Sequence, residues 1–222
     1  MNKTRAGKMA PMRLTKLGHA CLHIADGDAS ILLDPGVFSA GFEELRGLTA
    51  ILITHQHVDH LDMDRMAVLV EANPQALVVA DHDTAGQLAD AQITAQVARA
   101  GEVLDAGGLS VRVFGEQHAV IHADIPVIPN LGYLVGDTVF HPGDSFTLPD
   151  VAVPVLALPT GAPWLKAGEV IDFLRAVAPH LTVPIHERTL AMPEMEYQRL
   201  ERLRPADTEV RVLSDGESTD VT

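Results

Sequence analysis

Residues 54–60 read Thr54-His55-Gln56-His57-Val58-Asp59-His60, and they place four potential metal ligands within six positions. The run begins where an apolar strand pattern over residues 50–54 ends, and a helical pattern follows from about Asp62, which is suited to cap that helix. Imidazole nitrogens and carboxylate oxygens are ligands that zinc and related divalent ions accept. In an extended loop His55 and His57 point the same way, whereas Asp59 and His60 are offset by the turn into the helix. The spacing therefore predicts two metal positions rather than a polar surface cluster.

Further candidate ligands stand at other predicted strand ends. His118 begins a strand pattern over residues 117–120, and His122 competes with it for the same role, although residues 123–126 make His122 look like part of a loop. Asp144 follows the strand pattern 138–140 in a tight Gly143-Asp144 turn, where its carboxylate can bridge two cations or cap its own backbone. His186 ends the apolar run 181–185. We predict His118, Asp144 and His186 as additional ligands.

Short apolar runs bounded by Gly, Pro and Asp continue along the whole chain in two groups, each with strands followed by helices. Two sheets packed face to face with helices outside would accommodate them, so we expect an α/β (α+β) fold with four αββα layers. No linker or repeat divides the sequence, and we expect one domain over residues 1–222, with flexible ends at 1–10 and 215–222. The predicted strands cover residues 12–17, 20–25, 30–34, 50–54, 77–80, 108–114, 117–120, 132–135, 138–140, 151–158, 181–185 and 209–213, and the predicted helices cover 63–71, 84–90, 166–177 and 193–203.

Composition narrows the class of substrate. The 222 residues hold 16 Lys and Arg against 30 Asp and Glu, a net charge of −14, which repels phosphate backbones and disfavours nucleic acid. A small-molecule substrate is expected instead. No apolar run approaches the roughly 18 residues of a membrane helix, and we expect no membrane partner. The single cysteine, Cys21, fits a reducing compartment, so we predict a cytoplasmic protein and leave its oligomeric state open.

The HxHxDH run, the later His118, the Gly143-Asp144 pair and the strand-tip His186 together resemble the metallo-β-lactamase superfamily over nearly the whole chain. The resemblance implies an αββα sandwich with metals at the sheet edges. It implies that His55, His57 and His118 hold one ion, that Asp59, His60 and His186 hold the other, and that Asp144 bridges them. Dinuclear β-lactamases usually place a cysteine where this chain has Asp144, so antibiotic hydrolysis is not expected.

A narrower resemblance rests on Leu17-Gly18-His19-Ala20-Cys21, Leu33-Asp34-Pro35-Gly36 and His141-Pro142-Gly143-Asp144. These phrases are similar to the branch that contains ascorbate-phosphate lactonase and uncharacterised metal-dependent hydrolases. The branch implies that Asp34 supports the metal loop through hydrogen bonds. His19 and His141 are candidates to line the pocket and protonate a leaving group, or to be structural. Trp164 is either a wall of the cleft or a plug in the core, and Lys166 is a candidate contact for an anion.

The function that we predict is hydrolysis of a small-molecule ester, lactone or phosphodiester by a metal-bridging hydroxide. The cofactors are two divalent ions per chain, with Zn²⁺ expected and Mn²⁺ or Fe²⁺ as alternatives. Asp59, Asp144 and His141 are the predicted catalytic residues, and no GxSxG nucleophile motif occurs. Two alternatives remain: a mononuclear iron dioxygenase acting on a thiol or persulfide, and a metal-binding module without turnover.

Overall fold

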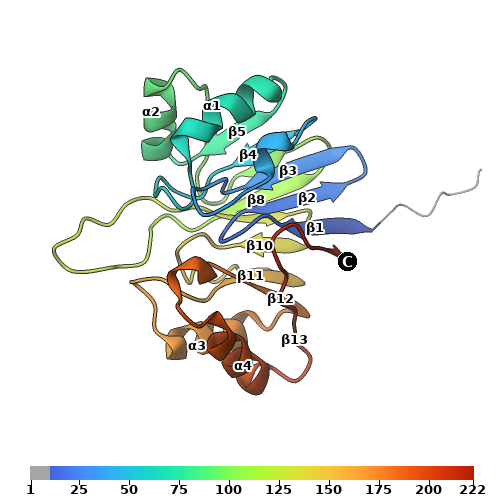
Figure 1. The fold of residues 1–222 in the computed structure, drawn as a ribbon, viewed down its shortest axis with the longest axis vertical. Helices are drawn as coiled ribbons and strands as arrows, with labels where there is room; N and C mark the ends of the chain where they lie inside the picture. Colours follow the sequence, from blue (N-terminus) through green and yellow to red (C-terminus); the bar gives the residue numbers. More distant parts are fainter. Residues whose placement is uncertain (1–10) are drawn as a thin grey trace, which may run out of the picture.

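The structure is a computed structural model that describes residues 11–222. Within this range, two seven-stranded mixed sheets pack face to face (Figure 1). The flexibility that the sequence predicts for residues 1–10 lies outside the described residues.

The first sheet joins residues 12–97 to the C-terminal end of the chain. Its strand order is β14-β1-β2-β3-β4-β5-β6; neighbours are antiparallel from β14 to β3 and parallel from β3 to β6. The strands are β1 (Met12–Lys16), β2 (Leu22–Asp26), β3 (Ala29–Leu33), β4 (Ala50–Leu52), β5 (Leu77–Ala80), β6 (Gln96–Val97) and β14 (Ser218–Val221).

The second sheet repeats this plan. Its order is β13-β12-β11-β10-β9-β8-β7, with parallel neighbours from β13 to β10 and antiparallel neighbours from β10 to β7. The strands are β7 (Val103–Asp105), β8 (Ser110–Phe114), β9 (Gly132–Val135), β10 (Val139–His141), β11 (Val155–Pro159), β12 (Leu181–Ile185) and β13 (Glu209–Val210).

Helices cover the outer face of each sheet, which completes the predicted αββα order (Figure 1). On the first sheet, α1 (Met63–Ala72) and α2 (His82–Asp90) bury Met66, Leu69 and Leu88. On the second sheet, α3 (Ala167–Val177) and α4 (Pro193–Leu203) bury Leu174 and Leu200. Short 3₁₀ turns cover Phe42–Glu44 and Glu187–Thr189. The α/β fold class predicted from the sequence is confirmed.

One continuous apolar core lies between the sheets and draws side chains from both, such as Leu14 and Ile31 from the first and Val135 and Val183 from the second. Their inward positions follow the two-residue alternation of the strands. None of the helices in residues 11–222 is long and apolar enough to cross a membrane.

Two predictions about local structure were wrong. Residues 117–120 do not form a strand, because the segment from Gly115 to Asn130 is a loop that pairs only through a single bridge between Gln117 and Pro129. Two prolines, Pro126 and Pro129, remove donors that a strand ladder needs there. The tail predicted to be flexible over 215–222 instead supplies β14, which pairs with β1 and buries Val221. In this strand the more buried Thr219 and Val221 alternate with the exposed Ser218 and Asp220. The pattern is too short to predict a strand from the sequence.

The topology brings the carboxyl ends of the central parallel strands to one edge of the sandwich. Asp34 follows β3, the 54–60 loop follows β4, Asp144 follows β10 and His186 follows β12. Two backbone hydrogen bonds join the sheets at this edge, from Leu131 to Thr54 and from His186 to His19. Loops that follow parallel strands are where such folds place their ligands, so this edge is the candidate site.

Candidate metal centre

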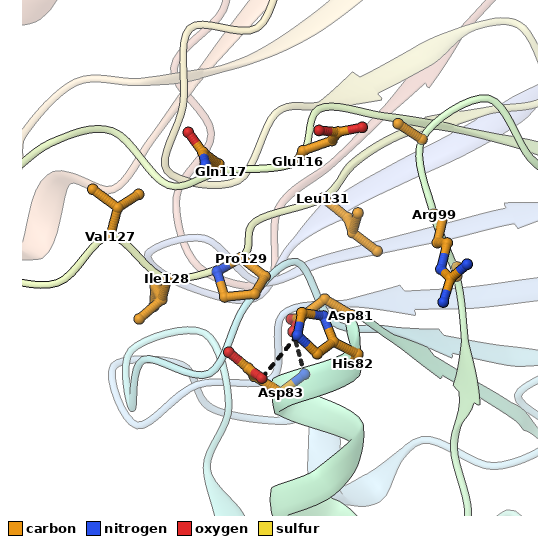
Figure 2. Close-up of a pocket in the computed structure, with 12 residues that line it drawn as sticks. Asp81, His82, Asp83, Arg99, Glu116, Gln117, Val127, Ile128, Pro129 and Leu131 are labelled. Atoms are coloured by element: carbon orange, nitrogen blue, oxygen red, sulfur yellow. Dashed lines mark hydrogen bonds and ion pairs between the residues drawn. The ribbon is translucent and has the colours of Figure 1, made fainter.

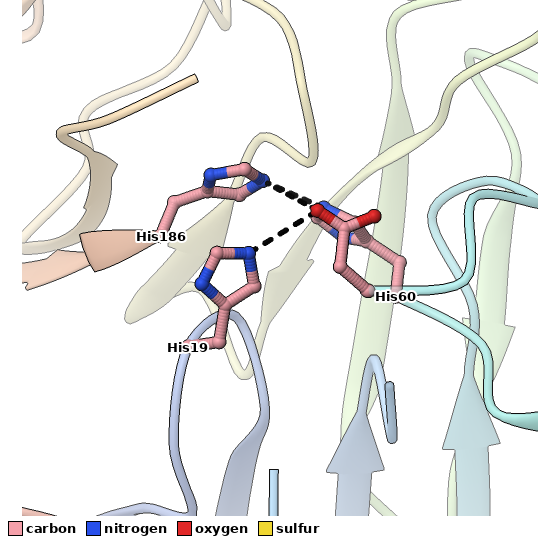
Figure 3. A group of neighbouring side chains, drawn as sticks. His19, His60 and His186 are labelled. Atoms are coloured by element: carbon pink, nitrogen blue, oxygen red, sulfur yellow. Dashed lines mark hydrogen bonds and ion pairs between the residues drawn. The ribbon is translucent and has the colours of Figure 1, made fainter. Parts of the chain in front are cut away.

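Eight ligand-type side chains gather at this edge in two groups. One group contains His55, His57, His118 and Asp144, and the other contains His19, Asp59, His60 and His186; within each group the ligand atoms lie within 4.8 Å of one another. All seven residues predicted as ligands are among the eight, and His19 is the addition. Figure 3 shows His19, His60 and His186 converging from three separate segments of the chain.

The hydrogen bonds of three histidines fix which ring nitrogen carries the proton. Nδ1 of His60 lies 2.6 Å from Asp34 Oδ2, Nδ1 of His118 lies 2.6 Å from the Ala119 carbonyl, and Nδ1 of His186 lies 2.5 Å from the Gly161 carbonyl. Each partner is an acceptor, so each Nδ1 donates a proton. In the neutral form of each ring, Nε2 therefore holds the lone pair and faces the groups, which is the arrangement that outer hydrogen bonds impose on metal-binding histidines.

The same logic applies to His55. Thr54 Oγ1 donates to Asp34 Oδ2 at 2.7 Å and therefore accepts from His55 Nδ1 at 3.0 Å. His55 Nε2 then accepts from or faces His57 Nδ1 at 3.1 Å. His60 and His186 differ, because both have Nδ1 held by an acceptor, and in the neutral rings their two Nε2 lone pairs face each other at 3.1 Å. Two lone pairs at this distance repel unless a cation lies between them. A proton or a metal ion can supply that cation.

Asp144 lies between the two groups. Its Oδ1 is 3.2 Å from His60 Nε2 and 3.1 Å from His186 Nε2, while its Oδ2 is 3.3 Å from His118 Nε2. Asp144 Oδ1 and His118 Nε2 are nevertheless buried without a hydrogen-bond partner. Buried polar atoms are rarely left unpaired. The two unpartnered atoms, together with the facing Nε2 atoms of His60 and His186, fit divalent ions held by both groups.

The electrostatics of the metal-free site point the same way. Burial would raise the pKa of Asp144, but the His60 and His186 charges outweigh it and hold the pKa well below its usual range. Burial would lower the pKa of His186, but the carboxylates of Asp144 and Asp59 raise it to about 9. The site is therefore built to hold positive charge between carboxylates.

His19 differs from the other histidines of the two groups. The backbone N–H of Arg188 donates to its Nδ1 at 3.3 Å, so the proton of the neutral ring is on Nε2. Burial lowers the pKa of His19 to about 4, which keeps the ring neutral. Nε2–H therefore donates to Asp59 Oδ2 at 3.2 Å and offers no lone pair to an ion. The structure makes His19 a hydrogen-bond donor to a candidate ligand.

Asp34 anchors the loop that carries the HxHxDH run. Its carboxylate accepts from the Thr54 backbone N–H at 2.8 Å, in addition to Thr54 Oγ1 and His60 Nδ1. Gly36 lets the loop pass close by, because a Cβ at this position would lie 1.8 Å from the Asp59 carbonyl oxygen. The supporting role that the resemblance implied for Asp34 thus has its contacts in the structure.

Asn130 supports the Asp144 turn and was not identified from the sequence. Its Oδ1 accepts from the Asp144 N–H at 2.9 Å, and its Nδ2 donates to the Pro142 carbonyl at 2.9 Å. Gly143 adopts φ +63°, and a Cβ there would lie 2.2 Å from Asn130 Oδ1. The only signal in the sequence is one asparagine before a buried strand, which does not specify this partner.

The structure shows where three histidines singled out by the sequence lie. His118 lies in the first group, whereas His122 is exposed on the 115–130 loop beside Asp124. The prediction of His141 as a catalytic residue is corrected: its ring is fully buried behind the site, Nε2 is 2.8 Å from the Ala20 carbonyl and Nδ1 accepts from the Gly143 N–H. Both ring nitrogens are occupied by backbone groups. His141 therefore positions the Gly143 turn.

A cleft of about 370 Å³ opens over the two groups. Trp164 lines it, buries most of its ring, and donates its indole N–H to Asp144 Oδ2 at 2.8 Å, so it is both a wall and a packed side chain. Lys166 lies outside the lining and pairs with Glu169. A larger pocket of about 460 Å³, lined by residues such as His82, Arg99 and Val127, contains none of the grouped ligands (Figure 2). The chemistry therefore lies at the smaller cleft.

Comparisons with known proteins agree with this architecture. Residues 13–186 match the family model described as beta-lactamase superfamily domain. Protein Rv0786c of Mycobacterium tuberculosis is 47% identical over 207 residues, which cover 90% of this chain and 96% of that protein. A UPF0173 metal-dependent hydrolase of Aeropyrum pernix is 29% identical and covers 93% of this chain and 96% of its own. The solved structure of Igni18, a metallo hydrolase from Ignicoccus hospitalis, shares the fold with a TM-score of 0.74 at 21% identity, over 95% of this chain and 98% of its own.

Proposed function

The chain belongs to the metallo-β-lactamase superfamily and is a metal-dependent hydrolase, and on this premise we propose that it uses two divalent ions to hydrolyse a small-molecule ester, lactone or phosphodiester. His55, His57 and His118 would hold one ion, and Asp59, His60 and His186 the other, with Asp144 between them. Zn²⁺ is the proposed metal, because imidazole nitrogens and carboxylate oxygens are among its usual ligands. Mn²⁺ and Fe²⁺ accept the same ligand types.

When bound, such ions supply a water activated near neutral pH and a Lewis acid for the substrate's carbonyl or phosphoryl oxygen. The protein's own contribution is orientation. Asp34 holds Thr54 and His60, and the carbonyls of Ala119 and Gly161 hold His118 and His186, so that each lone pair is directed before any ion arrives. Preorganisation of this kind reduces the reorganisation that binding and catalysis require.

Hydrogen-bond donors complete the site. Nε2–H of His19 holds Asp59 Oδ2, and Nε1–H of Trp164 holds Asp144 Oδ2. Each donor holds the Oδ2 atom of its carboxylate, which lies 3.4 Å from His186 Nε2 in Asp59 and 3.3 Å from His118 Nε2 in Asp144. Asp59 and Asp144, which the sequence nominated as catalytic residues, are proposed here as ligands that these donors orient.

The observation that carries the proposal is the pair of buried atoms without a hydrogen-bond partner, Asp144 Oδ1 and His118 Nε2, beside the facing Nε2 atoms of His60 and His186. The test is hydrolysis of a panel of lactones, aryl esters and phosphodiesters by zinc-loaded protein, with and without a chelator. We expect turnover that the chelator removes and that Asp144→Asn lowers by at least a hundredfold. Turnover that persists after complete metal removal would contradict the proposal.

We also propose a cellular location and a size class for the substrate. The single cysteine, Cys21, is buried and free, which suits a reducing compartment, and we propose a cytoplasmic location. The cleft volume suits a small molecule rather than a polymer.

A further inference from the structure

We propose that the substrate is uncharged and apolar beyond its reacting group: an ester or lactone with a hydrocarbon or aromatic substituent rather than a phosphodiester. This inference rests on the proposed hydrolase function and narrows its substrate class. It follows from the chemistry of the cleft walls, which is independent of the ligand groups beneath them.

Apolar side chains form much of the wall. Val58 stands on one side, and Ile121, Pro163 and Trp164 complete the lining that does not belong to the ligand groups or to two glutamines. Val58 is 65% exposed and therefore accessible to a substrate in the cleft. Outside this lining, Phe38 is also half-exposed, and its ring centroid lies 5.2 Å from that of His19 in an edge-on contact.

The polar part of the wall is neutral. Gln87 Nε2 donates to Gln56 Oε1 at 3.1 Å, so the two amides satisfy part of each other's hydrogen bonding. Amides of this kind can orient a neutral polar group but cannot compensate a negative charge. They offer an ester or lactone oxygen a donor at the rim of the cleft.

No lysine or arginine of residues 11–222 lines this cleft. The two cationic side chains that follow its lining residues in the sequence are paired elsewhere: Lys166 with Glu169, and Arg188 with Asp215. Recognition of a phosphate or carboxylate group usually employs arginine or lysine, and burying an anion without such a partner is costly. The net charge of −14 also disfavours the approach of anions. An anionic substituent would therefore find no compensation beyond the metals themselves.

Three hydroxamic acids that share a metal-binding head test the inference by binding alone. The phenyl ring of benzohydroxamate carries no charged substituent. The ring of 4-carboxybenzohydroxamate carries a carboxylate with one negative charge, and that of 4-phosphonobenzohydroxamate carries a phosphonate with a larger negative charge. Trp164 is the single tryptophan of the chain and lines the cleft, so its fluorescence reports occupancy. With zinc-loaded protein whose metal content has been measured, we expect benzohydroxamate to bind at least tenfold more tightly than either anion.

Two variants locate the cause of this preference. Ile121→Arg places a cation in the wall and should reverse the preference, whereas Val120→Arg, on an exposed neighbour outside the lining, should leave it unchanged. Lys166→Ala should also leave it unchanged. Equal or tighter binding of the anions by the wild-type chain would overturn the inference, as would failure of metal-loaded protein to bind benzohydroxamate. A chain that holds no metal after zinc loading would instead contradict the proposed function, and the metal measurement identifies that case separately.

Discussion

The indole N–H of Trp164 lies 2.8 Å from Oδ2 of Asp144, the carboxylate that stands between the two groups of candidate ligands. Oδ1 of the same carboxylate faces His60 and His186. Because an indole can only donate, this hydrogen bond favours the ionised carboxylate and fixes its rotation. Trp164, for which the sequence suggested only a wall of the cleft or a plug in the core, therefore positions the ligand that both metals would share.

Replacing Trp164 by Phe keeps an aromatic wall and removes the donor. We expect the variant to bind zinc about tenfold to a hundredfold more weakly in competition with a chelator, as is usual when an outer hydrogen bond to a ligand is lost. Phe146→Leu is the matched control. The ring centroids of Phe146 and Trp164 lie 4.9 Å apart, but a phenyl ring donates no hydrogen bond to Asp144. Unchanged zinc affinity in Trp164→Phe would show that the bond has no positioning role.

The same bond has a spectroscopic signature. The chain has one tryptophan, so an amide-type ¹⁵N–¹H spectrum contains one indole signal. We expect Asp144→Ala to move this signal upfield and zinc to shift it in the wild-type chain but not in Asp144→Ala. An indole signal that ignores the Asp144 substitution would contradict the hydrogen bond.

His19 and the candidate ligands should separate in their effects. Because the Arg188 N–H occupies Nδ1 of His19, its Nε2 is a donor, and His19→Ala should retain both metal ions while hydrolysis falls about tenfold or more. His57→Ala should lose metal together with turnover. Metal counting on the two purified variants makes the comparison; loss of one ion in His19→Ala would reassign this ring as a ligand.

Three further histidine variants test the choice of ligands. His118→Ala should lower the metal content, whereas His122→Ala should not, because His122 is exposed on the loop. His82→Ala should behave as the wild type, since His82 lies at the other pocket. The assignment of His118 fails if only the His122 variant loses metal.

Gly36 should tolerate no side chain. A Cβ at this position would overlap the Asp59 carbonyl, so Gly36→Ala has to displace the loop that carries His55 to His60, and we expect a loss of about 2 kcal/mol or more in the free energy of unfolding. Gly168→Ala is the control: nothing lies within 4 Å of its added Cβ in α3, and it should stabilise by up to about 1 kcal/mol. Denaturant unfolding of metal-free protein measures both; a neutral Gly36→Ala would contradict the close approach.

Much of the site was predictable because its parts are local in the sequence. The HxHxDH run holds four of the ligand-type residues on one loop, and Asp144 and His186 each follow an apolar strand that the pattern reveals. Partners that meet only through the tertiary fold were not predictable. The donor to His19 comes from residue 188, and Asn130 reaches the Asp144 turn from the end of a long loop.

The backbone conformation of several site residues was also not predictable from the sequence. His19, Asp34 and His186 all have positive φ, at 49°, 47° and 66°, which non-glycine residues adopt only at a cost. No propensity argument places such conformations, because the surrounding contacts impose them. The prediction of a strand at 117–120 failed for a different reason: Val120 is exposed, and the segment pairs with the chain only through the bridge between Gln117 and Pro129.

The central claim is that both ligand groups hold metal, and elemental analysis of the purified chain after zinc equilibration tests it most directly. We expect two divalent ions per wild-type chain and fewer in both Asp144→Ala and His57→Ala. One iron per chain would favour the dioxygenase alternative. A wild-type chain that retains no metal after repletion would contradict the account.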